Sequence, residues 1–323
     1  MSLPRCSKAA LAAMLCLASY TAAASPFPSR PITMIVPYAA GGFASTLAHM
    51  LSERMARTLG QPVIVDNRPG ANGNIAARLV AKAAPDGYTV LLGTSSVLAI
   101  NPHLYKDVAF QPLSDFAPVG QLVTTANVVV VNPADGIASV QDLVEHAKAQ
   151  RDATFASSGI GSSMHLSGEM FNVRAGTHMT HVPYKGSAPA LTDLMAGRIT
   201  TMFSDTTALP HVQAGKLRAI AVTGAQRMAA IPDIPTVQEA GIADFVVESW
   251  YALVAPTGTP QDAVLRLSQA AQSAVNDDTV KRRLAEIASQ PAEDGSPAHL
   301  ETVLRKELQT WADVVAQSGA KAQ

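Results

Sequence analysis

Pro31-Ile-Thr-Met-Ile-Val-Pro-Tyr-Ala-Ala-Gly-Gly-Phe-Ala-Ser-Thr-Leu-Ala-His49 combines the patterns of a strand, a loop and the start of a helix. The β-branched run over 32–36 predicts the strand, Gly41-Gly42 predicts the loop, and Ser45 or Thr46 is placed to cap the helix. A helix N-terminus carries unpaired N–H groups and a partial positive charge, and glycines let an anion approach that backbone. The stretch therefore predicts a seat for a carboxylate or a phosphate.

Strand and helix patterns alternate along the rest of the chain, which indicates an α/β fold with largely parallel sheets. We expect the polar loops that follow the strands to meet at one crevice, because ligands of such folds bind outside the carboxyl ends of the strands. These loops are 38–45, 67–73, 94–96, 157–163, 184–187 and 204–207. We expect further strands over 63–66, 89–93, 119–131, 154–156, 181–183, 200–203, 219–223 and 246–255. We expect helices over 45–58, 74–83, 139–149, 188–196, 261–287 and 297–318, and another that follows the 157–163 loop and ends at 171.

The composition indicates a compact globular protein. Of 323 residues, 48% are apolar and only 15% are charged, and the formal net charge is -1. No basic stripe is present, which argues against a nucleic-acid partner. The length is sufficient for two domains that each bury a core.

The first 24 residues have the pattern of a secretory signal peptide. Arg5 and Lys8 form a basic segment, residues 9–18 are apolar, and 22–24 supply small residues for cleavage. The apolar run is too short to span a bilayer, and no later apolar run approaches about 18 residues. We therefore expect an exported protein located in the periplasm.

Both cysteines, Cys6 and Cys16, lie inside the predicted signal peptide. Disulfides, thiolate catalysis and cysteine metal sites are therefore not expected after cleavage. A lipoprotein signal with Cys16 as the lipidated residue is the alternative interpretation. Met14 and Leu15 occupy positions that require small residues, so soluble export is favoured.

The sequence contains no recognisable catalytic or metal-binding motif. It lacks Gly-x-Ser-x-Gly, a Walker loop, Gly-x-Gly-x-x-Gly and His-Glu-x-x-His. A serine hydrolase that pairs Ser162 with a histidine remains open, although no motif supports it. A surface adhesion module is a third interpretation, and it predicts exposed apolar patches. The histidines (His165, His178, His181 and His211) fit no metal-ligand spacing, so we expect no metal or cofactor.

Several sequence blocks, taken in their order and spacing, carry a family likeness over nearly the whole chain after residue 24. The blocks are Val36-Pro-Tyr-Ala-Ala-Gly-Gly42, Val65-Asp-Asn-Arg-Pro-Gly-Ala-Asn-Gly73, Pro85-Asp-Gly-Tyr-Thr-Val90, Gly93-Thr-Ser-Ser96, Ser157-Ser-Gly-Ile-Gly-Ser-Ser-Met-His165, His181-Val-Pro-Tyr-Lys-Gly-Ser-Ala-Pro-Ala190, Leu209-Pro-His-Val-Gln-Ala-Gly-Lys-Leu-Arg218 and Ile231-Pro-Asp-Ile-Pro-Thr-Val237. With them the chain resembles the periplasmic solute-binding proteins of tripartite tricarboxylate transporters, the Bug family.

The resemblance implies a type II periplasmic-binding-protein fold, in which two α/β lobes close over a ligand cleft. The expected first lobe comprises 25–125 and 247–323, and the expected second lobe comprises 126–246. The implied function is capture of a small organic carboxylate, such as a di- or tricarboxylate or an aromatic acid, for a membrane permease. A ligand-sensing receptor that serves a signalling partner is the alternative. We expect a monomer with no catalytic activity.

The resemblance also implies a set of ligand-binding residues, which lie in the loops that grip the carboxylate. From the first lobe they are Tyr38, Ala40, Gly41, Gly42, Phe43, Ser45, Thr94 and Ser95. From the second lobe they are Ser157, Ser158, Gly159, Ser162, His165, Tyr184, Lys185, Gly186, Asp205 and Thr206.

Each of these residues also has a structural interpretation. The Gly41-Gly42 pair fits a tight turn, and 157–163 fits a solvated loop. Asp205 fits a helix cap, and Lys185 fits an ordinary solvated lysine. We interpret Trp250 and Tyr251 as core or hinge packing where the chain recrosses between the lobes.

The chain departs from the usual family pattern beside the proposed anion seat. Ser45 stands where Asp is usual, and His49 stands where Arg is usual. A neutral hydroxyl removes negative charge from the start of the helix and removes a partner for an α-ammonium group. We therefore expect plain carboxylates to be favoured over amino acids. Phe43 adds an aromatic face that would favour an aromatic or longer acid.

Overall fold

The structure, a computed structural model, describes residues 27–40, 43–150, 152–184 and 186–318. The predicted signal peptide over 1–24 lies outside the described residues, and so do the predicted site residues Gly41, Gly42 and Lys185.

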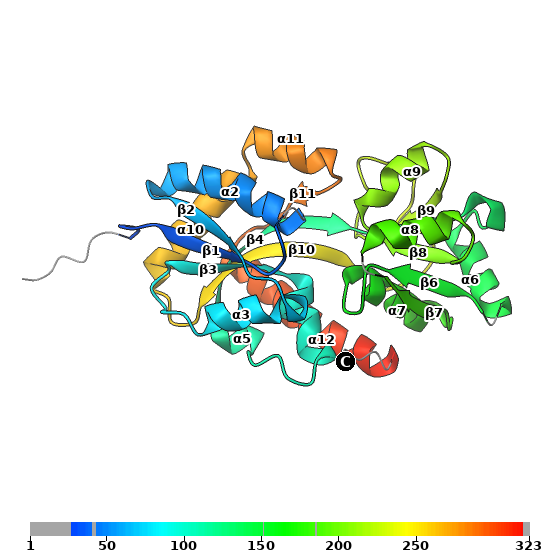
Figure 1. Cartoon of the computed structure of the whole chain (residues 1–323), viewed down its shortest axis with the longest axis horizontal. Helices are drawn as coiled ribbons and strands as arrows, with labels where there is room; N and C mark the ends of the chain where they lie inside the picture. Colours follow the sequence, from blue (N-terminus) through cyan, green and yellow to red (C-terminus); the bar gives the residue numbers. More distant parts are fainter. Residues whose placement is uncertain (1–26, 41–42, 151, 185, 319–323) are drawn as a thin grey trace, which may run out of the picture.

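Two lobes, each built on one β-sheet, lie side by side along the long axis of the molecule (Figure 1). The first lobe contains a six-stranded sheet of order β11-β4-β10-β3-β1-β2. Its strands are β1 (Ile32–Val36), β2 (Val63–Asn67), β3 (Thr89–Thr94), β4 (Phe116–Ala126), β10 (Glu248–Pro256) and β11 (Gln290–Pro291). The second lobe contains a five-stranded sheet of order β7-β6-β8-β5-β9. Its strands are β5 (Val128–Val131), β6 (Thr154–Ser157), β7 (Thr180–Pro183), β8 (Thr201–Ser204) and β9 (Arg218–Val222).

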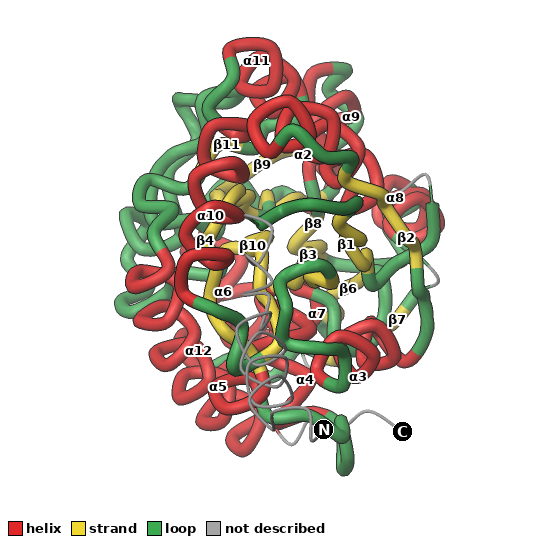
Figure 2. The backbone as a smooth tube through the Cα atoms, turned by 90° about the vertical axis from the view of Figure 1, so that its left-hand side faces the viewer, coloured by secondary structure: helices red, strands yellow, loops and turns green. Residues whose placement is uncertain are grey.

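Helices surround the strands of both lobes, as the view along the long axis shows (Figure 2). The helices of the first lobe are α2 (Phe43–Leu59), α3 (Asn74–Ala81), α4 (Asn101–Leu104), α5 (Pro112–Asp115), α10 (Gln261–Val275), α11 (Asp278–Glu286) and α12 (Pro297–Ser318). Short helical turns add η1 (Ala71–Gly73) and η2 (Ser96–Ile100). The helices of the second lobe are α6 (Val140–Ala149), α7 (Ser163–Ala175), α8 (Ser187–Met195) and α9 (Leu209–Gln213), with short turns η3 (Pro133–Asp135) and η4 (Thr206–Ala208).

The chain crosses between the lobes after Ala126 and returns before Glu248. The Thr223 side chain joins the two crossings: its Oγ1 accepts from Asn127 N at 2.8 Å and donates to Val247 O at 2.6 Å. Thr223 is fully buried, so both bonds are shielded from water. These two crossings connect the lobes.

The sheets are mixed, whereas the sequence pattern predicts largely parallel sheets. β10 runs antiparallel to both β3 and β4, and β5 runs antiparallel to β8 and β9. The reason is the double crossing, because one crossing strand leaves the first lobe and the other returns to it. The strands that carry the βα units, β1–β3 and β6–β8, are parallel within each sheet as predicted.

Several predicted element boundaries are wrong, including the following three. The predicted strand over 119–131 is two strands, β4 and β5, because the chain changes sheets at Asn127. The predicted helix over 261–287 is two helices, since Asp277 accepts N–H bonds from Thr279 and Val280 and caps a new helix, α11. The helix after the first strand begins at Phe43, two residues earlier than predicted, so neither Ser45 nor Thr46 precedes it as a cap.

The longest helix, α12, joins the cores of the two lobes. It packs on β4 of the first lobe and on α7 of the second. Trp311 and Val314 of α12 belong to the same buried cluster as Phe155 and Phe171 of the second lobe. One buried cluster therefore extends from the first lobe into the second along the contact between α12 and α7.

Candidate functional site

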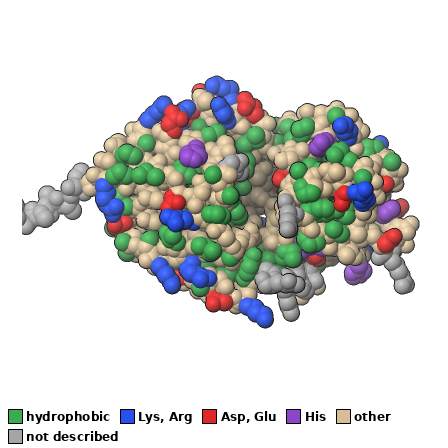
Figure 3. Space-filling view, in the orientation of Figure 1, with side chains coloured by type: hydrophobic (Ala, Val, Ile, Leu, Met, Phe, Trp, Pro, Cys, Tyr) green, Lys and Arg blue, Asp and Glu red, His purple; other side chains and the backbone are tan. Residues whose placement is uncertain are grey.

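A polar cleft of about 250 Å³ lies between the lobes. The space-filling view shows the surface hollowed between them (Figure 3). Segments that follow the carboxyl ends of β1, β2, β3 and β6 contribute most of the lining, and β10 contributes the rest. The lining residues are Tyr38, Asn72, Thr94, Ser95, Ser96, Ser158, Gly159, Ile160, Ser162, Ser163, Ser249 and Tyr251.

The wall of the first lobe is held by hydrogen bonds between its loops. The Tyr38 hydroxyl lies 3.2 Å from Thr94 Oγ1. Asn67 Nδ2 donates to the carbonyl of Tyr38 at 2.7 Å, which ties the loop after β1 to the end of β2. Thr94 Oγ1 also accepts from Val97 N at 3.3 Å, which holds the start of η2. The hydroxyl groups of this wall are therefore positioned before any ligand arrives.

Two tyrosines of the cleft keep their protons throughout the physiological pH range. Burial raises the pKa of Tyr38, and the hydrogen bond with Thr94 offsets part of that shift. Burial also raises the pKa of Tyr251, and the neighbouring Tyr38 and Asp205 raise it further. The ring of Tyr251 packs on Phe43, with the ring centroids 4.9 Å apart. Both residues thus present neutral hydroxyls that can donate to an anion.

The wall of the second lobe is the N-terminus of α7. Ser162 is its N-cap, since Ser162 Oγ accepts from His165 N at 3.2 Å and donates to Gly159 O at 2.7 Å. Ser163, the first residue of the helix, lines the cleft. Unpaired N–H groups at a helix start favour a negatively charged ligand.

The 157–163 loop, which leads into α7, is supported by buried side chains. Ser157 is fully buried, and its Oγ accepts from Gly159 N at 3.1 Å and lies 2.7 Å from His181 Nε2. The rings of His165 and His181 stack with centroids 3.9 Å apart. Burial, and secondarily His165, lowers the pKa of His181 to about 3. His181 is therefore a neutral structural residue, consistent with the structural interpretation of these histidines.

Of the fifteen predicted ligand-binding residues that the structure describes, six line the cleft. Tyr38, Thr94, Ser95, Ser158, Gly159 and Ser162 line it. Ala40, Phe43, Ser45, Ser157, His165, Tyr184, Gly186, Asp205 and Thr206 are not among the residues that line it. Phe43 contacts the cleft indirectly through Tyr251, and Ser157 and His165 support the loop that lines it.

Three further predicted site residues, for which the binding role stays a prediction, make contacts within the protein. Ser45 is buried in the first turn of α2, where its Oγ donates to Asn67 Oδ1 at 3.4 Å. Asp205 accepts from Thr207 N at 3.1 Å as the cap of η4 and from Ser187 Oγ at 2.8 Å. The Tyr184 hydroxyl donates to Asp193 Oδ2 at 2.8 Å.

The cleft also contains residues that the predicted set omits: Asn72, Ser96, Ile160, Ser163, Ser249 and Tyr251. Most of them lie in loops that the sequence pattern indicates. The sequence favours core or hinge packing for Tyr251, and Ser249 lies in the same predicted strand over 246–255. Because residues two apart on a strand lie on the same face, Ser249 and Tyr251 could have been predicted to face the same side of the sheet.

The contacts of the serines give no support to a serine hydrolase. Ser162 Oγ bonds to a carbonyl and to a backbone N–H. Ser157 does meet a histidine ring, but its side chain is completely buried. Within the described ranges, no group of three or more His, Cys, Asp or Glu side chains is arranged to hold a metal ion.

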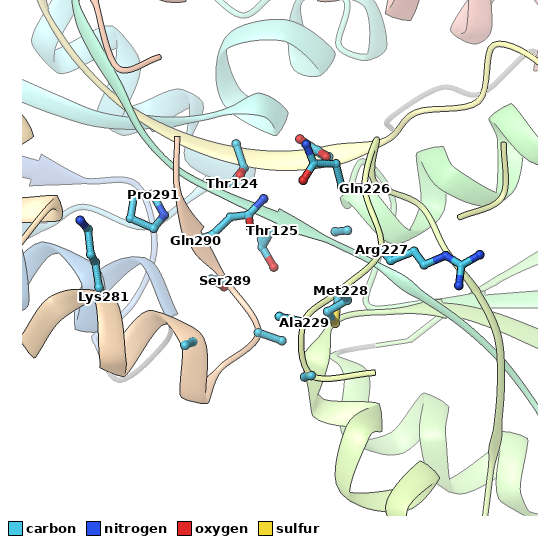
Figure 4. A pocket seen from close by; sticks show the side chains of 15 residues that line it. Thr124, Thr125, Gln226, Arg227, Met228, Ala229, Lys281, Ser289, Gln290 and Pro291 are labelled. Atoms are coloured by element: carbon cyan, nitrogen blue, oxygen red, sulfur yellow. The ribbon is translucent and has the colours of Figure 1, made fainter. Parts of the chain in front are cut away.

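A second hollow, of about 300 Å³, lies near β11 and the 226–230 segment (Figure 4). Small and apolar side chains such as Met228 and Ala229 contribute to its lining. Arg227 and Lys281 lie at its two ends, and Arg227 Nε already pairs with Glu239 at 2.9 Å. The hydroxyl-rich cleft is therefore the better candidate for binding a small polar ligand.

None of the helices in the described part of the chain combines the length and the apolar character needed to span a bilayer.

Comparison with known proteins gives relatives that match over nearly their full lengths. BugT of Bordetella pertussis is 36% identical over 92% of this chain and 92% of its own length. A protein from the ttuE-ttuC' intergenic region of Agrobacterium vitis is 39% identical over 91% of this chain and 86% of its own.

Solved structures of similar proteins superpose on both lobes. Rpa4515 of R. palustris, solved with adipate, has a TM-score of 0.78 and 35% identity, covering 91% of this chain and 99% of its own. MatC of Rhodopseudomonas palustris, solved with malate, has a TM-score of 0.76 and 32% identity, covering 90% of this chain and 100% of its own. These matches confirm the two-lobed periplasmic-binding fold.

Residues 47–319 match the family model described as the tripartite tricarboxylate transporter family receptor. This match and the relatives confirm the resemblance seen in the sequence, and the chain belongs to that family of periplasmic solute-binding receptors.

Proposed function

We propose that this protein captures a small organic carboxylate between its lobes and delivers it to the membrane permease of a tripartite tricarboxylate transporter. The observation that carries this proposal is a cleft between two lobes, lined by hydroxyl groups and by the N-terminus of α7. The family membership and the acids bound by two relatives support it. The chain would act as a monomeric periplasmic protein after removal of residues 1–24.

The chemistry of the cleft suits a carboxylate. Among the described residues that line it, none has a charged side chain, so binding would rely on neutral donors. Hydrogen bonds from hydroxyls and backbone N–H groups to a carboxylate are charge-assisted and stronger than neutral ones. The helix dipole of α7 adds a favourable field at the same point. The volume of about 250 Å³ fits a small acid.

The absence of charged side chains among the described lining residues also affects which acids the cleft would bind. Ser45, which replaces the Asp usual in the family, is buried against Asn67 and gives no negative charge to pair with an ammonium group. Plain di- and tricarboxylates would therefore bind in preference to amino acids. The Phe43–Tyr251 ring pair would add apolar contact for an aromatic or longer acid.

Closure would occur about the two crossings at Asn127 and Val247. We assign 25–125 and 247–323 to the first lobe and 126–246 to the second. A ligand that bonds to both walls stabilises the closed form, and the permease would recognise that form.

A thermal-shift screen of residues 25–323 tests this proposal. The panel contains mono-, di- and tricarboxylates, aromatic acids and amino acids, with adipamide as an uncharged control for adipate. Ligand at a hundredfold excess over Kd stabilises the folded state by about 2.7 kcal/mol, which a melting curve resolves. We expect a shift with one class of acid and none with adipamide. A flat response to every acid would contradict the carboxylate assignment.

A further inference from the structure

Asn72, in the 70–74 loop of the first lobe, contacts the 157–163 loop of the second lobe, which lines the cleft and is called the ligand-side loop. Its Nδ2 donates to the carbonyl of Gly161 at 3.5 Å and to Asn101 Oδ1 at 3.0 Å. Two acceptors around one end of the amide identify that end as the nitrogen. Asn72 also lines the cleft. One side chain therefore faces the ligand site and bridges the lobes.

A second asparagine holds this side chain in place. Asn101 is fully buried, and its Nδ2 donates to Asn74 Oδ1 at 2.6 Å and to the Asn72 carbonyl at 3.0 Å. Asn101 follows η2, which begins at the hydroxyl-rich segment that forms the cleft wall. The 70–74 loop is thus attached to the cleft wall by a satisfied network, and it presents the Asn72 amide without further ordering.

The backbone on both sides is shaped for close approach. Asn72 has φ 49° and ψ 37°, a left-handed conformation that asparagine tolerates better than most residues. Gly161 has φ +82°, and a Cβ added there would lie 2.8 Å from Leu104 Cδ2 and 3.1 Å from Asn72 Nδ2. A side chain on Gly161 would therefore press on the Leu104 and Asn72 side chains. Non-glycine residues held in a rare conformation occur often at functional sites.

We propose that Asn72 is a latch between the lobes, which bonds the second lobe's ligand-side loop when the cleft closes. The identity of the retained ligand rests on the proposed function, but closure can be measured without a ligand. The bond to Gly161 forms only when the loops meet, so it stabilises the closed form and not the open form. Loss of one such bond lowers the ratio of closed to open molecules by about two- to tenfold. For a bound acid, most of this effect falls on the dissociation rate.

Two variants isolate the latch. Asn72→Gly removes the amide and keeps a residue that accepts the left-handed conformation. Asn72→Asp keeps the shape but replaces the donor with a carboxylate, which can only accept. Asn276→Ala is the matched control, because Asn276 is exposed, lies outside the cleft lining, and its amide donates to the carbonyl of Gln272 in the last turn of α10.

Single-molecule energy transfer between the lobes gives the readout. Labels at Thr58→Cys on α2 and Gln213→Cys on α9 would be site-specific, because residues 25–323 contain no cysteine. Both positions are exposed and lie on different lobes. The closed fraction is measured without ligand, with adipate and with malate. We expect both Asn72 variants to lower the ratio of closed to open molecules, calculated from this fraction, by about two- to tenfold and Asn276→Ala to leave the ratio unchanged.

Equal closed fractions in wild type and in both Asn72 variants would overturn the latch. A wild-type protein with no closed population under any of the three conditions would overturn it as well. If the Asn72 variants fail to fold, as judged by circular dichroism, Gly161→Ala replaces them, because its Cβ would lie 3.1 Å from Asn72 Nδ2 and should displace the latch amide and lower the closed fraction. An unchanged closed fraction in Gly161→Ala would then overturn the latch. A wild-type protein that ignores every acid would count against the proposed function, while a lower ligand-free closed fraction in the variants would still support the latch.

Discussion

The Tyr251 side chain performs two tasks at the cleft. Its ring packs against Phe43, and its hydroxyl belongs to the lining. Burial keeps that hydroxyl protonated, because it raises the pKa of Tyr251 further above 10. The hydroxyl is therefore available as a donor at every pH at which the protein is expected to work.

We expect Tyr251→Phe to weaken binding of the acid that gives the largest thermal shift by about tenfold. A hydrogen bond to a charged group contributes about 1.5 kcal/mol or more, and the variant removes one while it keeps the ring contact with Phe43. Isothermal titration measures the change in Kd. Tyr88→Phe is the control, since the Tyr88 hydroxyl bonds to Ser29 at the edge of the first lobe. An unchanged Kd for Tyr251→Phe would show that its hydroxyl does not contact the acid.

Two helices of the second lobe, α6 and α7, begin with the same kind of cap in different places. Ser139 Oγ accepts from Asp142 N at 3.1 Å at the start of α6. Ser162 Oγ accepts from His165 N at 3.2 Å at the start of α7, and it also fixes the Gly159 carbonyl. Only the second cap lines the cleft. Substitutions of Ser139 and Ser162 can therefore distinguish the effect of a helix cap on stability from its effect on ligand binding.

We expect Ser162→Ala and Ser139→Ala to lower the free energy of unfolding by similar amounts, about 1 kcal/mol each. Only Ser162→Ala should also weaken binding of the acid, because it releases the cleft loop and removes a hydroxyl from the lining. Urea unfolding gives the stability, and titration calorimetry gives the affinity. Equal affinities in the two variants would contradict the role assigned to the α7 N-terminus.

At the scale of the whole molecule, a buried carboxyl group lies where α12 meets the crossing strand β10. Glu307, Trp250 and Trp311 line one hollow. Burial raises the pKa of Glu307 to about 7, and Glu248 adds to the shift, while Trp250, Trp311 and Lys306 lower it in part. The folded protein therefore holds a proton on Glu307 at a pH at which an unfolded chain has lost it.

This proton links stability to pH. Between about pH 4.5 and 7 the folded state binds more protons at Glu307 than the unfolded state, so its contribution to stability falls as the pH rises. We expect Glu307→Gln to be more stable than wild type at pH 8, by at most about 3 kcal/mol, and to lose that advantage by pH 4.5. Urea unfolding across this range measures the difference. Glu301→Gln, on the exposed face of the same helix, should have the same free energy of unfolding as wild type at both pH 4.5 and pH 8. A constant difference for Glu307→Gln would rule out the linkage.

Patterns that depend on neighbouring residues were predictable from the sequence. The strand over 32–36, the capped helix after Ser139 and the last helix over 297–318 appear where the local patterns indicate them. The loops after β1, β3 and β6 also meet at one cleft, as expected for the carboxyl ends of strands. Periodicity and capping act within a few residues, so one sequence contains that information.

Contacts between distant segments were not predictable in the same way. The break at Asn127 depends on the second sheet, because the β-branched pattern of 119–131 continues on both sides of it. Likewise, Asp205 could cap or bind, and only the position of Ser187 shows that the carboxylate already has partners.

The α/β class, the family and the loops of the candidate site follow from the amino-acid sequence. Packing determines which side chains of those loops face the cleft, that Tyr251 joins them from a crossing strand, and that Asn72 meets Gly161 across the lobes. The physical reason is range. Backbone propensity and hydrophobic periodicity operate within one element, whereas the orientation of a side chain at an interface depends on residues far away in the chain, which only packing brings together.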